Sequence, residues 1–183
     1  MQGSIFTAFS DMVIEQWGIE TWNELLVKVK PLSEGIYTSG MQYDDSEMMS
    51  LMTAFSEKTR IDKPSLLRKL GDYLFIYLYR NSPANLSHID NLKDFLLCID
   101  SVIHKEVKRL YPQAYLPNFD YSETADGDLV MFYHSKRKLC YLSEGLILGA
   151  ASHFDQKIII NHPECMHNGD DKCKLVISLR NKV

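Results

Sequence analysis

The spacing of apolar residues changes partway along the chain, and this change constrains the fold more than any other feature. From Ile5 to Leu110 apolar residues recur at the spacing of one face of an α-helix. After Pro112 the pattern becomes short apolar runs separated by turn residues, which is typical of strands. The sequence therefore predicts an α+β fold, with helices in the N-terminal part followed by a part built on an antiparallel sheet.

Glycine, proline and aspartate residues divide the helical part. Gly18 and Pro31 are expected to end the first two helices. Asp44 or Asp45 is expected to cap a third helix, and Pro64 to lie in the first turn of a fourth.

The remaining elements are predicted from the same signals. Apolar residues from Leu96 to Leu110 indicate one further helix, which ends before Pro112. Ser143 is expected to cap a later helix. Short strands are expected over residues 116–121, 129–133, 157–161 and 173–178.

Composition argues against several classes of partner. The 183 residues include 24 acidic and 20 basic side chains, for a net charge of −4. Because nucleic-acid binding needs a concentrated basic face, nucleic acid is not expected as a partner. No apolar stretch is long enough to span a membrane, and the N-terminus lacks a basic leader followed by an apolar segment. A cytoplasmic location is therefore expected, with no membrane association.

Three cysteines and a histidine near the C-terminus have the character of a metal site. Cys140, His162, Cys165 and Cys173 offer the sulfur and nitrogen ligands that Zn²⁺ prefers, and four such ligands would close a structural tetrahedral site. His167 is a possible substitute for His162 because it also lies close to Cys165 in sequence. The alternative is a set of buried reduced thiols without metal.

A second group of residues combines one histidine with a polar cluster. His104 lies on the flank of an apolar helical stripe, where a single neutral imidazole can hold a haem iron. Tyr133, Ser135 and Arg137 alternate along a predicted strand, so their side chains share one face and can receive carboxylates such as haem propionates. The alternatives are a core histidine and a solvated edge strand.

Taken together, these motifs resemble the H-NOX domain, the haem nitric-oxide/oxygen-binding family. The resemblance covers essentially the whole chain. It is carried by Met1-x-Gly3-x-Ile5, His104, Pro117 and Tyr133-x-Ser135-x-Arg137.

The resemblance implies a single domain over residues 1–183 that binds haem b. The haem would lie between a helical distal subdomain, about residues 1–62, and a proximal subdomain, about residues 63–183, that carries the axial ligand His104. Pro117 would press on the porphyrin and distort it. The zinc cluster resembles that of a subset of bacterial stand-alone members.

The resemblance also bears on which gas is bound. In oxygen-binding relatives a distal tyrosine follows the motif arginine, at the position that Leu142 occupies here. The other expected distal residues, Ile5, Phe9 and Leu74, are also apolar. Tyr141 is offset by one position and would enter the pocket only if the register slipped. The sequence therefore predicts a nitric oxide sensor that also binds CO and forms no stable oxygen complex.

Signalling is expected to pass to another protein. No kinase, cyclase or DNA-binding signature follows Leu179, so the resemblance implies a partner in trans, a histidine kinase or otherwise a cyclic-di-GMP enzyme. No nucleophile–base pair, paired-carboxylate motif or phosphate-binding glycine loop points to an enzyme. Residues 164–173 also resemble the zinc segment of vinyl-reductase-like domains, so the alternative is a haem-free, zinc-containing module that binds a small molecule or a protein.

Overall fold

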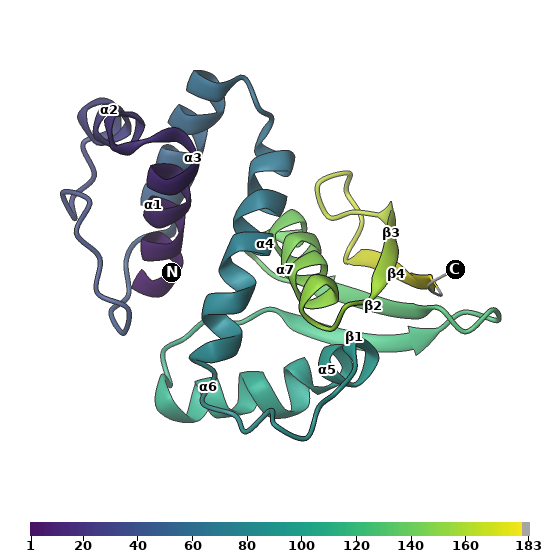
Figure 1. Cartoon of the computed structure of the whole chain (residues 1–183). Helices are drawn as coiled ribbons and strands as arrows, with labels where there is room; N and C mark the ends of the chain where they lie inside the picture. Colours follow the sequence, from purple (N-terminus) through teal and green to yellow (C-terminus); the bar gives the residue numbers. More distant parts are fainter. Residues whose placement is uncertain (181–183) are drawn as a thin grey trace.

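Two long helices, α4 and α7, stand between a helical N-terminal part and a four-stranded sheet (Figure 1). The computed structural model describes residues 1–180. In chain order the elements are α1 (Gly3–Trp17), α2 (Ile19–Val29), α3 (Asp45–Thr59), α4 (Lys63–Arg80), α5 (Leu92–Cys98), the π-helix η1 (Ile99–His104), α6 (Lys105–Leu110), β1 (Asn118–Glu123), β2 (Leu129–His134), α7 (Cys140–His153), β3 (Lys157–Glu164) and β4 (Cys173–Arg180). The predicted α+β class is confirmed.

A glycine and two capping aspartates set the ends of helices in the N-terminal part. Gly18 ends α1 with a positive φ of 87°, which a glycine adopts without strain. Asp44 is the cap of α3, because its carboxylate accepts the Ser46 N–H at 2.7 Å. Asp62 caps α4 in the same way, and Pro64 lies in the first turn as predicted.

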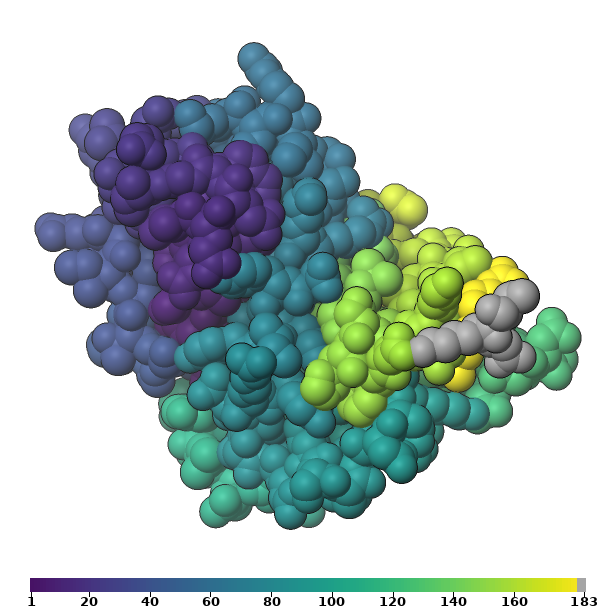
Figure 2. Space-filling model, in the orientation of Figure 1, coloured from purple at the N-terminus to yellow at the C-terminus, as the bar shows by residue number. Residues whose placement is uncertain are grey.

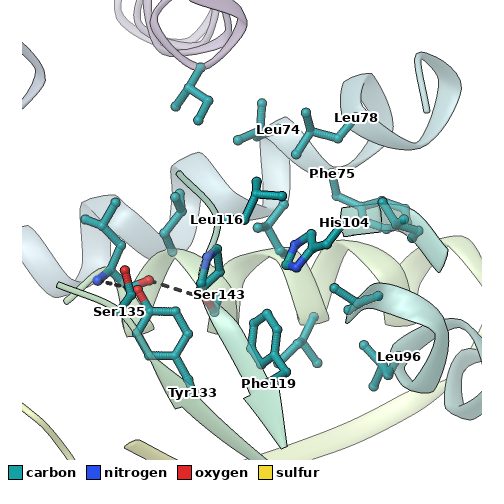
Figure 3. Close-up of a pocket in the computed structure, with 18 of the residues that line it drawn as sticks. Leu74, Phe75, Leu78, Leu96, His104, Leu116, Phe119, Tyr133, Ser135 and Ser143 are labelled. Atoms are coloured by element: carbon teal, nitrogen blue, oxygen red, sulfur yellow. Dashed lines mark hydrogen bonds between the residues drawn. The ribbon is translucent and has the colours of Figure 1, made fainter. Parts of the chain in front are cut away.

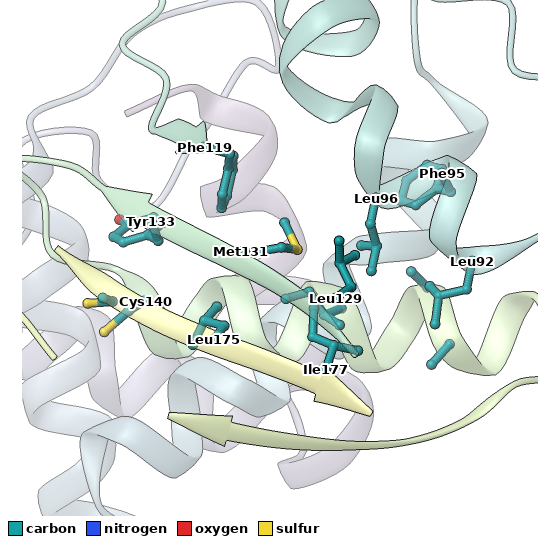
Figure 4. Close-up of a cluster of buried hydrophobic side chains, with 14 of the residues drawn as sticks. Leu92, Phe95, Leu96, Phe119, Leu129, Met131, Tyr133, Cys140, Leu175 and Ile177 are labelled. Atoms are coloured by element: carbon teal, nitrogen blue, oxygen red, sulfur yellow. The ribbon is translucent and has the colours of Figure 1, made fainter. Parts of the chain in front are cut away.

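The sheet is antiparallel throughout, with strand order β1-β2-β4-β3. Across β2 and β4, Met131 pairs with Leu175 and Leu129 with Ile177. These four side chains are buried in one cluster with Leu96 of α5, as Figure 4 shows. One face of the sheet is therefore covered by helices, which include α5 and α7.

Two hydrophobic clusters meet along α4 and α7. Leu70 and Leu142 belong to the cluster of the N-terminal helices, whereas Phe75 and Ile147 belong to the cluster that lies on the sheet. Figure 2 shows the N-terminal helices at one end of the molecule and the C-terminal strands at the other. Both helices thus contribute to both halves of the core.

Glycines allow α4 and α7 to approach with their backbones in contact. A Cβ atom at Gly71 would lie 2.3 Å from the Leu142 carbonyl oxygen, and one at Gly145 would lie 2.1 Å from the Arg68 carbonyl oxygen. No larger residue fits at these distances. The close approach fixes the position of the α7 side chains relative to α4.

The first strand begins later than predicted. The prediction over residues 116–121 started before Pro117, whereas β1 spans Asn118–Glu123. Proline has no backbone N–H to donate to a neighbouring strand, so the ladder begins with the next residue.

Ser143 does not cap α7, which begins four residues earlier than predicted, at Cys140. The Ser143 N–H already makes a helical bond to the Leu139 carbonyl, at 3.1 Å. The Leu139 N–H instead donates to the Tyr133 hydroxyl at 2.8 Å. A tertiary contact from β2 therefore determines where the helix starts.

The helix that carries His104 is not a continuous α-helix. The segment Ile99–His104 is a π-helix between α5 and α6. Such insertions are rare and frequently coincide with functional sites.

Among residues 1–180, no helix is both long and apolar enough to cross a lipid bilayer.

The contact between α4 and α7 predicts the effect of Gly145→Ala. Alanine is favoured over glycine inside a helix by about 0.5–1 kcal/mol. The clash with the Arg68 carbonyl should outweigh this gain, so the free energy of unfolding should fall by about 1–3 kcal/mol in chemical denaturation. Gly40→Ala is the control, since its added methyl group would lie 3.9 Å from the nearest atom. Equal stability of the two variants would contradict the close approach.

Candidate functional site

A largely apolar cavity lies where α4, η1, the start of β1, the end of β2 and α7 meet. It contains about 1160 Å³ of empty space, part of which opens to solvent. Figure 3 shows His104, Leu74 and Tyr133 around it. Eight of the residues predicted for the haem site line the cavity: Ile5, Leu74, His104, Pro117, Tyr133, Ser135, Arg137 and Leu142.

Phe9 was predicted to line this site, but it does not border the cavity. Its ring lies in the core of the N-terminal helices, 6.0 Å from the Trp22 ring and 5.7 Å from the Phe55 ring, between ring centroids. Phe9 is one helical turn beyond Ile5, where α1 faces α2 and α3 instead of the cavity.

His104 is held by a carboxylate on its own helix. Its Nδ1 lies 2.6 Å from Asp100 Oδ1, and Asp100 Oδ2 accepts the Phe119 N–H at 3.3 Å. Because an ionised carboxylate only accepts hydrogen bonds, Nδ1 carries the proton and the lone pair is on Nε2. Asp100 was missed from the sequence, although its spacing of four residues before His104 on a helix was a usable signal.

Burial keeps the His104 imidazole neutral. The side chain is 18% exposed, and burial lowers the pKa of His104 despite the opposing influence of Asp100. A neutral imidazole with a free Nε2 is the form that binds a metal. The ring therefore fits the role of an iron ligand at the edge of the cavity.

Tyr133, Ser135 and Arg137 all line the cavity, but they do not share one strand. β2 ends at His134, and the next residues form a turn in which Ser135 Oγ accepts the Arg137 N–H at 3.2 Å. The three side chains therefore reach the same cavity because of this turn, and not because they alternate along one strand as predicted. Burial raises the pKa of Tyr133 to about 12, so its phenol stays protonated.

Arg137 is the cationic group at this edge of the cavity. Its Nε donates to Asp45 Oδ2 at 2.5 Å, and Nη1 donates to the Tyr115 carbonyl at 2.7 Å. A guanidinium has five N–H donors, so others remain for a ligand carboxylate. The contact to Asp45, at the first residue of α3, also joins the two parts of the molecule.

Aliphatic side chains from α1, α4 and α7 border another part of the cavity. Ile5, Leu74 and Leu142 are all in this group. Tyr141 lies outside the cavity, because its ring is stacked on His167 with centroids 5.5 Å apart and lies 4.7 Å from the Arg68 guanidinium. Its one-residue offset from Leu142 thus turns it to the other side of α7.

The predicted metal ligands come together in a compact group. The ligand atoms of Cys140, His162, Cys165 and Cys173 all lie within 4.8 Å of one another. Cys165 Sγ is 3.8 Å from Cys140 Sγ and 3.9 Å from Cys173 Sγ. His162 Nε2 is buried without a hydrogen-bond partner in the described part of the chain. An orphaned nitrogen beside three buried thiols fits a tetrahedral Zn²⁺ site.

His167 does not belong to this group. Its Nε2 lies 2.8 Å from the Lys138 carbonyl oxygen, and the side chain is exposed. Burial, together with the neighbouring thiols, raises the pKa of Cys140. A bound cation would reverse this effect, since metal ligation deprotonates thiols.

The fold matches that of a family of haem-binding proteins. The profile of the haem-NO-binding family matches residues 2–162, and the chain belongs to this family. Its members are H-NOX domains, which bind haem and act as sensors without catalytic activity, so the domain described here is not an enzyme.

Solved structures of the family are similar along the whole chain. An H-NOX protein from Shewanella oneidensis in the Fe(II)NO state has a TM-score of 0.91 and 36% sequence identity, covering 99% of this chain and 100% of that one. The unliganded Fe(II) H-NOX protein from K. algicida has a TM-score of 0.90 and 30% identity, covering 100% and 98%.

A longer relative contains the same domain. Soluble guanylate cyclase gcy-32 from Caenorhabditis elegans is 26% identical over 171 residues, which are 87% of this chain. This chain covers only 24% of that protein.

The hydrogen bond between Asp100 and His104 predicts how the imidazole titrates. Asp100 raises the pKa of His104 against the larger effect of burial, so Asp100→Asn should lower that pKa further. The test is the pH dependence of the imidazole ¹⁵N shifts in haem-free protein. Asp120→Asn, an exposed change on neighbouring β1, is the control and should leave the pKa unchanged. A higher His104 pKa in Asp100→Asn would contradict the contact.

Proposed function

We propose that this domain binds haem b in the cavity and senses nitric oxide, with CO as a second gaseous ligand. One observation carries the proposal: a single cavity is lined by His104, by the carboxylate-binding group Tyr133, Ser135 and Arg137, and by aliphatic side chains. The family membership favours this function over a haem-free binding module. Related H-NOX proteins have been solved in Fe(II)NO and Fe(II)CO states.

Each lining group has a distinct task in this proposal. His104 presents a neutral Nε2 as the one protein ligand to iron, with its orientation fixed by Asp100. Arg137 and the hydroxyls of Tyr133 and Ser135 would hold the propionates, and Pro117 would be in contact with the porphyrin. When bound, haem supplies an iron that can take a diatomic gas on its free face.

The output is proposed to begin at His104. Asp100 bonds both His104 and the backbone of Phe119, so a shift of the imidazole is passed to the start of β1, next to Pro117. Arg137 and Asp45 connect that same region to α3. A distal subdomain of about residues 1–62 and a proximal subdomain of about residues 63–183 can then rotate relative to each other, with α4 contributing to both clusters.

We further propose that the signal is read by a histidine kinase in trans, or otherwise by a cyclic-di-GMP enzyme, in the cytoplasm of a bacterium. The support is the sensor role of the family and the occurrence of the domain within longer signalling proteins such as the soluble guanylate cyclase relative. For the second cluster we propose a structural Zn²⁺ ion held by Cys140, His162, Cys165 and Cys173.

Replacing His104 tests the haem assignment. His104→Gly should weaken haem binding more than about tenfold and abolish the Soret band of the five-coordinate ferrous wild type, because it removes the one protein ligand. Added imidazole should restore haem uptake but not the NO-dependent response of the kinase, since the new ligand is not attached to the helix. His88→Gly, an exposed control, should behave as wild type. A colourless wild-type protein that takes up no haemin would overturn the proposal.

Replacing Leu142 tests gas selectivity. The ferrous wild-type domain should bind NO and CO but show no persistent oxygen complex in air, because the aliphatic side chains there offer bound oxygen no hydrogen bond. Leu142→Tyr should prolong the oxygen complex by adding a hydroxyl, whereas Leu142→Phe, which adds the ring alone, should not. Absorption spectra followed in air measure the lifetime. A stable oxygen spectrum in wild type would refute the assignment.

A further inference from the structure

A buried carboxylate connects the cysteine–histidine cluster to the helix pair. The Glu144 side chain is 7% exposed, yet it is neither a member of the cluster nor a lining residue of the cavity. Its Oε1 lies 2.5 Å from His162 Nδ1, and its Oε2 accepts a hydrogen bond from Arg68 Nε at 2.5 Å. Burying a charged carboxylate costs free energy that its two partners only partly offset, so a functional reason for Glu144 is expected.

The contact fixes which nitrogen of His162 faces the thiols. A carboxylate accepts the proton on Nδ1, so the lone pair is on Nε2. His162 Nε2 is the buried nitrogen without a partner among the described residues. The His162 side chain is 12% exposed, so water does not readily replace the missing partner. Glu144 thus fixes the tautomer of His162 and keeps its Nε2 directed toward the thiols.

The position of Glu144 follows from α7. Cys140, the first residue of that helix, precedes Glu144 by four residues, so both side chains project from the same face. Arg68 reaches Glu144 from α4 because its backbone carbonyl lies against Gly145. The Arg68 guanidinium also lies 4.7 Å from the Tyr141 ring centre.

We propose that Glu144 is a positioning residue for the metal site, and that Arg68 holds Glu144 in place from α4. The inference rests on the proposed binding of metal by the four-residue cluster. A histidine ligand oriented by a carboxylate is more basic and better aligned, and loss of such a partner typically weakens metal binding 10–100-fold. Metal binding at the cluster is thereby coupled to the contact between α4 and α7.

The test compares Glu144→Gln with Glu164→Gln in the full chain. Glu164 is next to Cys165, and its neutralisation removes the same charge without touching a ligand, since its partner is Lys174 at 3.8 Å. Competition with a chromogenic chelator measures the affinity for Zn²⁺. Glu144→Gln should bind Zn²⁺ roughly 10–100-fold more weakly than wild type, and Glu164→Gln should bind it normally.

Two further measurements separate positioning from folding. Co²⁺ in place of Zn²⁺ should keep thiolate-to-metal absorption in Glu144→Gln, which shows that the same sulfur ligands bind. Glu144→Asp keeps the charge and should fall between wild type and Glu144→Gln. Arg68→Gln, in which the carboxylate remains, should lose less affinity for Zn²⁺ than Glu144→Gln. If Glu144→Gln does not fold, a lower Zn²⁺ affinity of Arg68→Gln than of wild type supports the positioning role, and an equal affinity contradicts it.

The outcomes are distinct. Equal Zn²⁺ affinity of wild type, Glu144→Gln and Glu164→Gln would overturn the positioning role while leaving the metal site intact. Wild-type protein that takes up neither Zn²⁺ nor Co²⁺ would reject the metal site and this inference together. Haem uptake, measured separately on the same samples, reports on the gas-sensing proposal alone.

Discussion

The backbone contact between α4 and α7 is the constraint on which both candidate sites depend. Because Gly71 and Gly145 have no side chains, the two helices pack closer than any other residues would allow. The contact brings Leu74 and Leu142 to the same cavity from two helices. On another side of α7 the same contact brings Arg68 within hydrogen-bond distance of Glu144. A wider separation would open the cavity and break the ion pair at once.

Carboxylates perform the same task in both sites. Asp100 binds Nδ1 of His104, and Glu144 binds Nδ1 of His162, which in each ring leaves Nε2 for a metal. Each carboxylate uses its second oxygen to fix the histidine to another element, β1 in one case and α4 in the other. A lone histidine could rotate and change tautomer. Held in this way, each ring has one orientation and transmits any displacement to its neighbour.

The sequence predicted the elements, most of the chosen residues that line the cavity, and the members of the cysteine–histidine cluster, because periodicity and motif spacing are local properties. The predictions from sequence were wrong where a tertiary contact sets the start of a helix or the direction of a side chain. Ser143 looked like a cap, yet the Tyr133 hydroxyl starts α7 earlier, and Phe9 faces Trp22 and not the cavity. The partner of Arg137, Asp45, is distant in sequence and left no local signal. Two signals were present and unused: the spacing of Asp100 and His104, and the Gly145-x-x-x-Gly149 repeat that marks close helix packing.

Tyr133 connects the cavity to the cysteine–histidine cluster. Its ring lines the cavity, while its hydroxyl accepts the N–H of Leu139, the residue before Cys140 of the cluster. Across the sheet Tyr133 pairs with Cys173, a second member of the cluster. A displacement of β2 at the cavity must therefore move the backbone that positions two thiols, or be resisted by them. A metal held by those thiols would stiffen this side of the cavity, and movement started at His104 would then be directed toward β1 and the N-terminal helices and not into the sheet.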